Sequence, residues 1–254
     1  MYLVDLSVSD GDGGVDSAST SVEVSPRTVW YVDDDAAGNP AHTVSPEFPF
    51  DVIQEGIDAA ASGHTVQVAA GTYPGNLTWT AKSLQLLGAG AASTIVDARG
   101  LGRCLSITNV PDTAVVDGFT FTGGSASSGG GLYVGSSSLR IQNSAIVHNV
   151  GEAKGGGIFL SSSAAVIVNN TISGNNGGIR GYSWDGGGGI YADFSSPVIA
   201  NNIITANNAS RLLSAGRERD FRRIILGLAE AHVHRLTRGV APFGLSRQQF
   251  DTPG

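Results

Sequence analysis

The sequence predicts an all-β solenoid in which the chain winds into a parallel β-helix. Glycine triplets open three similar segments, GGGLYV at 129–134, GGGIFL at 155–160 and GGGIYA at 187–192. The triplets follow one another at steps of 26 and 32 residues, and two columns of asparagine keep the same steps. A period in this range is typical of repeat architectures, whose units stack on one another. Strand-length apolar runs follow one another without helical patterns between them, so we expect stacked coils rather than βαβ units.

Composition and charge set bounds on the function. The chain has 254 residues, of which 36 are glycine, and 15% of its residues are charged. Its single cysteine, Cys104, excludes an intrachain disulfide. No run is apolar enough to span a membrane, and the first residues lack the pattern of a signal peptide. The net charge of −7 is divided at Asn208 into −11 before it (7 − 18) and +4 after it (8 − 4). We therefore expect no nucleic-acid partner for the acidic part.

Residues 1–25 are expected to be the remnant of a β-domain. Apolar and polar residues alternate on both sides of the turn signal DGDGG at 10–14, which predicts a hairpin with one buried face. This stretch resembles the last two strands of a polycystic kidney disease (PKD) type, immunoglobulin-like domain. The resemblance implies a fragment of a longer secreted protein. Asp10 and Asp12 could bind calcium, although Asp-Gly is first of all a turn formula.

A strand and a helix are expected ahead of the first complete coil. TVWYV at 28–32 has the composition of a strand, and the acidic triplet 33–35 follows it. We interpret this triplet as a solvated loop, because three consecutive side chains of a strand cannot face one point. Phe50 to Ala61 carries apolar residues at helical spacing. Such a helix would cover the apolar interior and the unpaired strand edge of the first coil.

Two stretches connect the chain to a known family. PFDVIQEGIDAAASGHTVQVAAGTY at 49–73 and GGGIFLSSSAAVIVNNTISGNN at 155–176 are similar to right-handed parallel β-helix proteins of bacterial cell surfaces, a pectin lyase-like group. The similarity spans residues 29–208 and implies a β-helix domain over 28–208 with an extracellular or cell-surface location. It does not select an activity, because this fold carries pectate lyases, glycoside hydrolases, adhesins and passive stalks alike.

Each coil is expected to contain three strands, and alternation assigns the faces of the first. Its inward residues are Leu132, Val134, Ile158, Leu160, Ile190 and Ala192. Its outward residues form an aromatic column, because coils stack about 4.8 Å apart: Tyr133, Phe159 and Tyr191. Asn143, Asn169 and Asn201 are expected at turns, since asparagine tolerates the left-handed conformation, and stacked amides can form a ladder between coils.

Two unequal loops are expected on one corner, beside the aromatic column. They run over 150–154 and 176–185, and the second is the longer one because the two repeat steps differ by six residues. Loops on a rigid scaffold often carry function. Their charged and aromatic residues should converge: Glu152, Lys154, Arg180, Tyr182, Trp184 and Asp185. In the pectate lyase-like families that the chain resembles, the substrate groove also lies between the first-strand wall and the preceding loops.

The site has two interpretations. In one, a sugar-binding platform is formed by Tyr133, Phe159, Tyr182, Trp184 and Tyr191. In the other, the column only stabilises the face of the sheet, as cross-strand aromatic residues do. Glycoside hydrolysis would require two carboxylates about 5–9.5 Å apart, and a lyase would require a carboxylate cluster with a base. The candidates for such chemistry are Glu152, Arg180, Asp185 and Asp193.

The sequence favours a non-catalytic module that binds polysaccharide or cell-surface glycan, or that serves as an adhesive or structural element. The alternative is a polysaccharide-active enzyme, pectate lyase-like or a glycoside hydrolase, with its groove at the first-strand wall. No cofactor or metal site is predicted beyond the calcium that acidic turns could hold. The oligomeric state is left open.

Residues 209–254 break the pattern of the repeat. They are rich in arginine, and five of them follow helical spacing: Phe221, Ile224, Ile225, Leu228 and His232. Three interpretations remain: an amphipathic C-terminal cap, a basic helix for an anionic surface, or foreign sequence such as an out-of-frame translation. A cap or a foreign tail is favoured over membrane binding.

Overall fold

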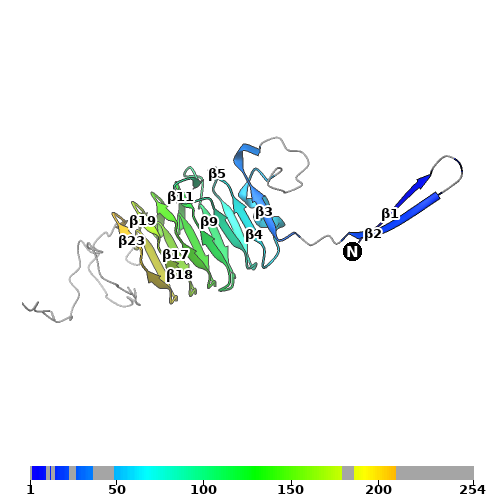
Figure 1. Cartoon of the computed structure of the whole chain (residues 1–254). Helices are drawn as coiled ribbons and strands as arrows, with labels where there is room; N and C mark the ends of the chain where they lie inside the picture. The colour runs from blue at the N-terminus through cyan, green and yellow to red at the C-terminus, as the bar shows by residue number, and fades with distance from the viewer. Residues whose placement is uncertain are drawn as a thin grey trace, which may run out of the picture.

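The coils of the chain stack along one axis. The computed structural model describes residues 2–9, 12, 15–22, 27–36, 49–178 and 186–209. In Figure 1 the colour runs from blue at β3 (Val29–Val32) to yellow at β23 (Ile203–Thr205), so position in the sequence follows position in the stack. The strands of the coils pair in parallel with their counterparts one coil away. The predicted all-β solenoid is confirmed.

Three long parallel sheets form the walls of the solenoid. Sheet I consists of β3, β4 (Thr65–Val68), β7 (Gln85–Gly88), β10 (Val115–Asp117), β14 (Arg140–Gln142), β18 (Val166–Val168) and β22 (Val198–Ala200). Sheet II consists of β5 (Gly71–Pro74), β8 (Thr94–Asp97), β11 (Thr120–Thr122), β15 (Ala145–Val147), β19 (Thr171–Ser173) and β23. Sheet III consists of β6 (Leu77–Thr80), β9 (Leu105–Thr108), β13 (Leu132–Gly135), β17 (Ile158–Ser161) and β21 (Ile190–Asp193).

A fourth, shorter sheet was not predicted. Sheet IV lies between sheets II and III in chain order and consists of β12 (Ser125–Ser128), β16 (Val150–Lys154), β20 (Asn176–Gly177) and β24 (Asn208–Ala209). The expectation of three strands in each coil is therefore wrong for the glycine-triplet coils. The segment 150–154, expected to be a loop, is strand β16, because its backbone pairs with both neighbouring coils.

The interior is a stack of apolar side chains in register. In sheet III, Leu132, Ile158 and Ile190 lie one above another, as predicted from alternation. Leu132, Ile158 and Leu160 are fully buried. Complete burial of such a side chain stabilises the fold by about 1.5–3 kcal/mol. The inward columns of all the walls thus supply one continuous core along the axis.

Each repeat coil turns at bends where one residue adopts a left-handed conformation. Between sheets I and II this residue is Asn143, Asn169 or Asn201, with φ of 49°, 58° and 55°. Asparagine tolerates this region better than most residues, so the predicted turn position of this column is confirmed, whereas the predicted ladder of amides is formed by other asparagines. Two further bends use less expected residues, His148 and Ala206 after sheet II and Ser136, Ser162 and Phe194 after sheet III.

The hydrogen-bonded ladders occupy different positions from the left-handed asparagines. Each ladder residue directly follows a left-handed one and points inward. The Asn149 N–H and side-chain amide both donate to Asn175 Oδ1 at 3.0 Å, and Asn175 repeats these contacts with Asn207. At another bend, the Ser137 N–H donates to the Ser163 hydroxyl at 3.2 Å, and the Ser163 N–H donates to the Ser195 hydroxyl at 2.9 Å. At each bend, one backbone N–H has no backbone partner. A side chain of the next coil accepts a hydrogen bond from it.

The glycine triplet 155–157 is required for three separate reasons. Gly155 has φ of +58°, which favours glycine. A Cβ on Gly156 would collide with the carbonyl oxygen of Asn176 in the next coil. A Cβ on Gly157 would lie 2.6 Å from the carbonyl oxygen of Gly189 and 3.0 Å from the Nδ2 of Asn175. The triplet thus marks the point where the backbone approaches both the next coil and the asparagine ladder.

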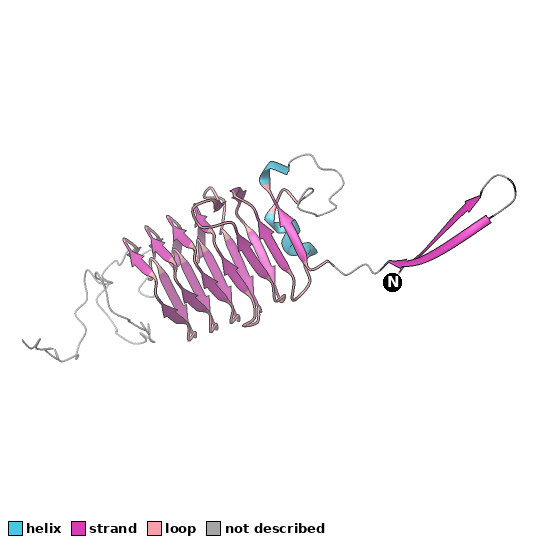
Figure 2. Cartoon of the chain, viewed as in Figure 1, coloured by secondary structure: helices cyan, strands magenta, loops and turns pink. Residues whose placement is uncertain are grey.

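One helix closes the N-terminal end of the stack, beside β3 (Figure 2). Helix α1 spans Ile53–Ala59 and is shorter than the expected 50–61, because Phe50 pairs with Val32 in a bridge and Ala60 is extended. Ile53 and Ile57 are buried. The Lys82 ammonium donates to the carbonyls of Ile57 and Asp58 at 2.9 Å, which caps the C-terminal end of the helix. The predicted covering role is confirmed.

Two further strands are hard to recognise in the sequence. The strand β5 was missed, since GTYP is short and contains proline. The run AVVDGFTFTGG forms two strands, β10 and β11, because Gly118 turns the chain between them with φ of +78°.

The N-terminal hairpin is present, with β1 (Tyr2–Ser9) and β2 (Val15–Val22) antiparallel. Its PKD-type identity stays a prediction, and the tail from residue 210 on lies outside the described residues. Among the helices described, none is long and apolar enough to cross a bilayer.

Candidate functional site

The predicted aromatic column lies on the outer face of sheet III. Tyr133, Phe159 and Tyr191 are adjacent in register across β13, β17 and β21. The ring centroids of Tyr133 and Phe159 are 5.6 Å apart, and those of Phe159 and Tyr191 are 5.9 Å apart, with interplanar angles of 39° and 32°. Such separations are those of interacting aromatic pairs. The three rings therefore pack against one another along the axis in tilted pairs.

A cation covers the N-terminal end of this column. The Arg103 guanidinium lies 4.8 Å from the centroid of the Tyr133 ring, within the range of a cation–π interaction. Its Nε donates to the carbonyl of Gly129 at 3.0 Å and its Nη2 to that of Ser128 at 2.8 Å. Burial lowers the pKa of Arg103 from its ordinary value. The side chain thus joins sheet III to the chain entering the next coil.

A second cation covers the C-terminal end of the column. The Lys154 ammonium lies 4.9 Å from the Tyr191 centroid and 3.3 Å from Asp193 Oδ2. The predicted convergence of Lys154 with the column is therefore observed, and it also includes the candidate acid Asp193. Glu152 lies on the same strand, β16, and is half-buried. Arg180, Tyr182, Trp184 and Asp185 lie outside the described residues, so their roles stay predictions.

The rings of the aromatic column contact one another and the wall, which leaves little of their surface for a ligand. Phe159 is only 8% exposed between its two neighbours. The Tyr133 ring leans over Gly135, where an added Cβ would lie 2.8 Å from Tyr133 Cε1. Asp193 is committed to Lys154. This geometry favours the interpretation of the column as a stabilising element of the wall.

The acidic triplet converges, contrary to expectation. Its three side chains offer carboxylate oxygens within 4.8 Å of one another. The reason is that the chain leaves β3 into a 3-10 turn, η1 (Asp34–Ala36), instead of continuing as a strand. Asp34 Oδ2 accepts the Thr72 N–H at 2.8 Å, and the Asp34 N–H donates to the Tyr73 hydroxyl at 3.3 Å. These bonds connect η1 to β5. Calcium binding at Asp10 and Asp12 stays a prediction.

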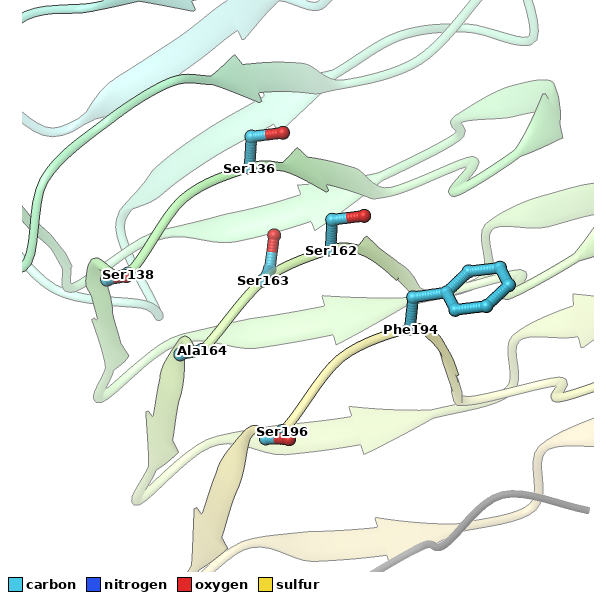
Figure 3. Close-up of a pocket in the computed structure, with 7 residues that line it drawn as sticks. All are labelled: Ser136, Ser138, Ser162, Ser163, Ala164, Phe194 and Ser196. Atoms are coloured by element: carbon cyan, nitrogen blue, oxygen red, sulfur yellow. The ribbon is translucent and has the colours of Figure 1, made fainter.

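A hollow at the bend between sheets III and I was not predicted. It has a volume of about 340 Å³ and is lined by Ser136, Ser138, Ser162, Ser163, Ala164, Phe194 and Ser196. Phe194 is 85% exposed and holds φ of +47°, an unusual conformation for a bulky residue. Figure 3 shows its ring in one row with the side chains of Ser136 and Ser162, pointing the same way.

The hydroxyl groups around this hollow fall into two sets. The ladder serines are engaged, since Ser163 Oγ donates to the carbonyls of Val134 and Ser161 at 3.0 Å. Within the part of the chain that the structure describes, the hydroxyls of Ser136, Ser162 and Ser196 make no hydrogen bond, and all three residues are exposed. The hollow therefore presents free donors and acceptors beside one exposed ring. The sequence signal for this hollow was Phe194, which occupies the position that Ser136 and Ser162 hold in the two preceding coils.

Comparisons with known proteins agree with this architecture. The chain matches the protein-family model described as "Right handed beta helix region" over residues 93–221, just over half of its length. No curated protein and no solved structure matches the chain.

Proposed function

The chain belongs to the right-handed β-helix family, and from that premise we propose that it is a non-catalytic module that binds polysaccharide. A location outside the cell or on its surface is part of this proposal and rests on the resemblance of the sequence. A β-helix is a rigid support whose bends and loops are free to vary, and such positions commonly carry binding residues.

The observation that supports polysaccharide binding best is the exposed ring of Phe194 beside unpaired serine hydroxyls. A sugar ring has an apolar face of C–H groups and a rim of hydroxyls. An aromatic side chain can pack against the first, and the serines can bond with the second. A phenylalanine is unusual at this left-handed bend, where the two preceding coils carry Ser136 and Ser162.

The spacing of the hollow suits a polymer better than a single sugar. Ser136, Ser162 and Phe194 occupy one column in three successive coils. Coils repeat at about 4.8 Å, close to the length of one sugar in an extended chain. A polysaccharide lying along the axis could contact several coils. Each contact would be weak, but together they would raise the affinity.

The same surfaces offer little support for catalysis. Asp193 is paired with Lys154, and the rings of the aromatic column stack on one another. A polysaccharide lyase or glycoside hydrolase stays the alternative. Release of reducing ends or of unsaturated products from a polysaccharide panel would favour that alternative.

Affinity gels that contain neutral or acidic polysaccharides test the binding proposal. We expect Phe194→Ala to weaken retention by about tenfold in Kd, which corresponds to about 1.4 kcal/mol. Leu101→Ala is the matched control, because Leu101 is another exposed apolar residue, at 80%, outside the hollow. Absence of binding by the wild-type chain across the panel would contradict the proposed function. Equal losses in both variants would contradict the role of Phe194.

A further inference from the structure

The hollow beside Phe194 is lined by uncharged groups. Its walls consist of five serines, Ala164 and Phe194. Figure 3 shows Ser138, Ala164 and Ser196 in a second row, beside the row that contains Phe194. A serine hydroxyl both donates and accepts hydrogen bonds, as the hydroxyl of a sugar does. A carboxylate only accepts, and its strong partners are the charged donors of arginine and lysine. The lining therefore matches a hydroxylated ligand better than a carboxylated one.

The two cations described on the sheet III side of the hollow are held by other groups. The Lys154 ammonium lies 3.3 Å from Asp193 Oδ2 and 4.9 Å from the centroid of the Tyr191 ring. Arg103 donates through Nε and Nη2 to backbone carbonyls. Phe194 directly follows Asp193, so the charge nearest to the ring along the chain is a carboxylate. An acidic sugar would therefore find no ready partner on this side.

On the sheet I side, one cation adjoins the hollow. Arg140 is exposed and stands two residues after Ser138, at the start of β14. The same position holds Val166 in β18 and Val198 in β22, and the three residues pair in register from coil to coil. A polymer of uronic acids carries a carboxylate on every sugar, whereas this wall presents one guanidinium in three coils. The other two coils would meet it with apolar side chains.

The charge of the solenoid adds a second reason. The chain up to Asn208 has a net charge of −11 (7 − 18). At the end of the hollow away from Phe194, the Ser138 N–H donates to the Val110 carbonyl at 3.0 Å, and the exposed Asp112 follows in that neighbouring connection. A field of one sign lowers the local concentration of ligands that carry the same sign. Both reasons act against polyanions and leave uncharged sugars unaffected.

We propose that the hollow selects uncharged, extended polysaccharides and discriminates against polymers of uronic acids. This inference rests on the proposed function and specifies the ligand of the same site. The C–H face of a neutral sugar packs against Phe194, and its hydroxyls bond with the hydroxyls of Ser162 and Ser196. A uronate in the same place would lose water from its carboxylate without gaining a charged donor, which costs free energy.

Retention on immobilised polymers tests this selectivity in the full chain. The probes are two uncharged polymers, hydroxyethylcellulose and glucomannan, and two uronate polymers, polygalacturonate and alginate. We expect binding to an uncharged polymer with a Kd that changes less than about twofold between roughly 50 and 300 mM NaCl, because salt screens charges only. The Kd for the uronate polymers should be at least about tenfold higher, since the lining offers them no charged donor.

The outcomes separate this inference from the proposed function. Binding to a uronate polymer that equals or exceeds binding to the uncharged ones, and that Phe194→Ala weakens, would overturn the selectivity. Polysaccharide binding at the hollow would then stand. Absence of retention on every one of these polymers would instead contradict the proposed function, and the selectivity with it.

Substitutions at two positions test the physical reason. Ala164 is exposed in the middle coil of the hollow, so Ala164→Lys supplies a cation without disturbing the core. It should lower the Kd for polygalacturonate by about tenfold at low salt, whereas Ala164→Gln, which adds length without charge, should not. Arg140→Gln should leave binding to the uncharged polymers unchanged. No gain in Ala164→Lys, or a loss in Arg140→Gln as large as that in Phe194→Ala, would show that the lining does not set the selectivity.

Discussion

At the scale of single residues, the coil depends on a two-residue device at its bends. A left-handed residue turns the chain, and the next residue points a polar side chain inward to accept an N–H from the preceding coil. His148 followed by Asn149 and Ser162 followed by Ser163 are two examples. The inward polar atom is satisfied by hydrogen bonds, as a buried polar group must be to avoid a cost of about 1–3 kcal/mol. Phe194 is the position where this device carries an unexpected side chain.

Two buried ionisable residues predict a loss of stability at alkaline pH. The pKa of Tyr73 is raised to about 12, mainly by burial, while the Asp34 N–H opposes this shift and the carboxylates of Asp34, Asp33 and Asp35 add to it. Burial likewise raises the pKa of Cys104 from 9.0 to about 12. Both groups keep their protons longer when folded, so the unfolded chain deprotonates first as the pH rises. The stabilisation is complete below about pH 9 and should be lost between pH 9 and 12.

Urea unfolding at pH 8 and pH 11 measures this effect. Each group contributes at most about 1.4 kcal/mol per pH unit between its two pKa values. Tyr73→Phe with Cys104→Ala should flatten the dependence above pH 9, because neither side chain then titrates. An equally steep decline in the double variant would show that other groups are responsible.

At the scale of the element, one coil is a unit defined by its ladders and its glycine triplet. Asn175 connects two coils through its side chain, with Nδ2 donating to the Ile146 carbonyl at 2.8 Å and Oδ1 accepting from Asn149. The strands are only two to five residues long in these coils. Their stability therefore depends on contacts between coils rather than on any strand alone.

Asn175→Ala should reduce the unfolding free energy by about 3 kcal/mol, because it removes the acceptor of the buried Asn149 N–H and side-chain amide and the donor to the Ile146 carbonyl. Asn169→Ala is the matched control in the same coil. Asn169 is exposed with φ of 58°, so its replacement loses only its tolerance of that conformation, about 1–2 kcal/mol. Equilibrium denaturation measures both variants. Equal effects would show that the ladder does not stabilise the coil.

At the scale of the whole molecule, the stack is close to one-dimensional, since each coil contacts the coils beside it. One end is covered by α1, and the central coils have neighbours on both sides. In such repeat proteins, stability is nearly a sum of terms for repeats and for their interfaces. The column Arg103–Tyr133–Phe159–Tyr191–Lys154 adds to these interfaces on the outside of sheet III.

Hydrogen exchange should follow this order of coils. Amides of β14 and β15, in the middle of the stack, are expected to exchange at least about tenfold more slowly than those of β22 and β23 in the last described coil. Peptide-resolved mass spectrometry of the native chain measures the difference. Equal protection along the axis would mean that the coils open together as one unit.

The sequence by itself determined the solenoid, its inward columns and the aromatic column. These features follow from the alternation of apolar and polar residues and from the fixed period of the repeat. Both can be recognised in the sequence without knowledge of contacts. It also predicted the left-handed asparagines, because that preference belongs to the residue itself.

Only the tertiary structure decided how the same residues are used. It assigned the asparagine ladders to the positions after the left-handed bends, made 150–154 a strand of sheet IV and brought the acidic triplet together. It also placed cations against the aromatic column and set Phe194 beside a row of serines. Apart from the acidic triplet, which the local turn η1 brings together, each of these depends on contacts between neighbouring coils, and such contacts exist only after the chain has wound.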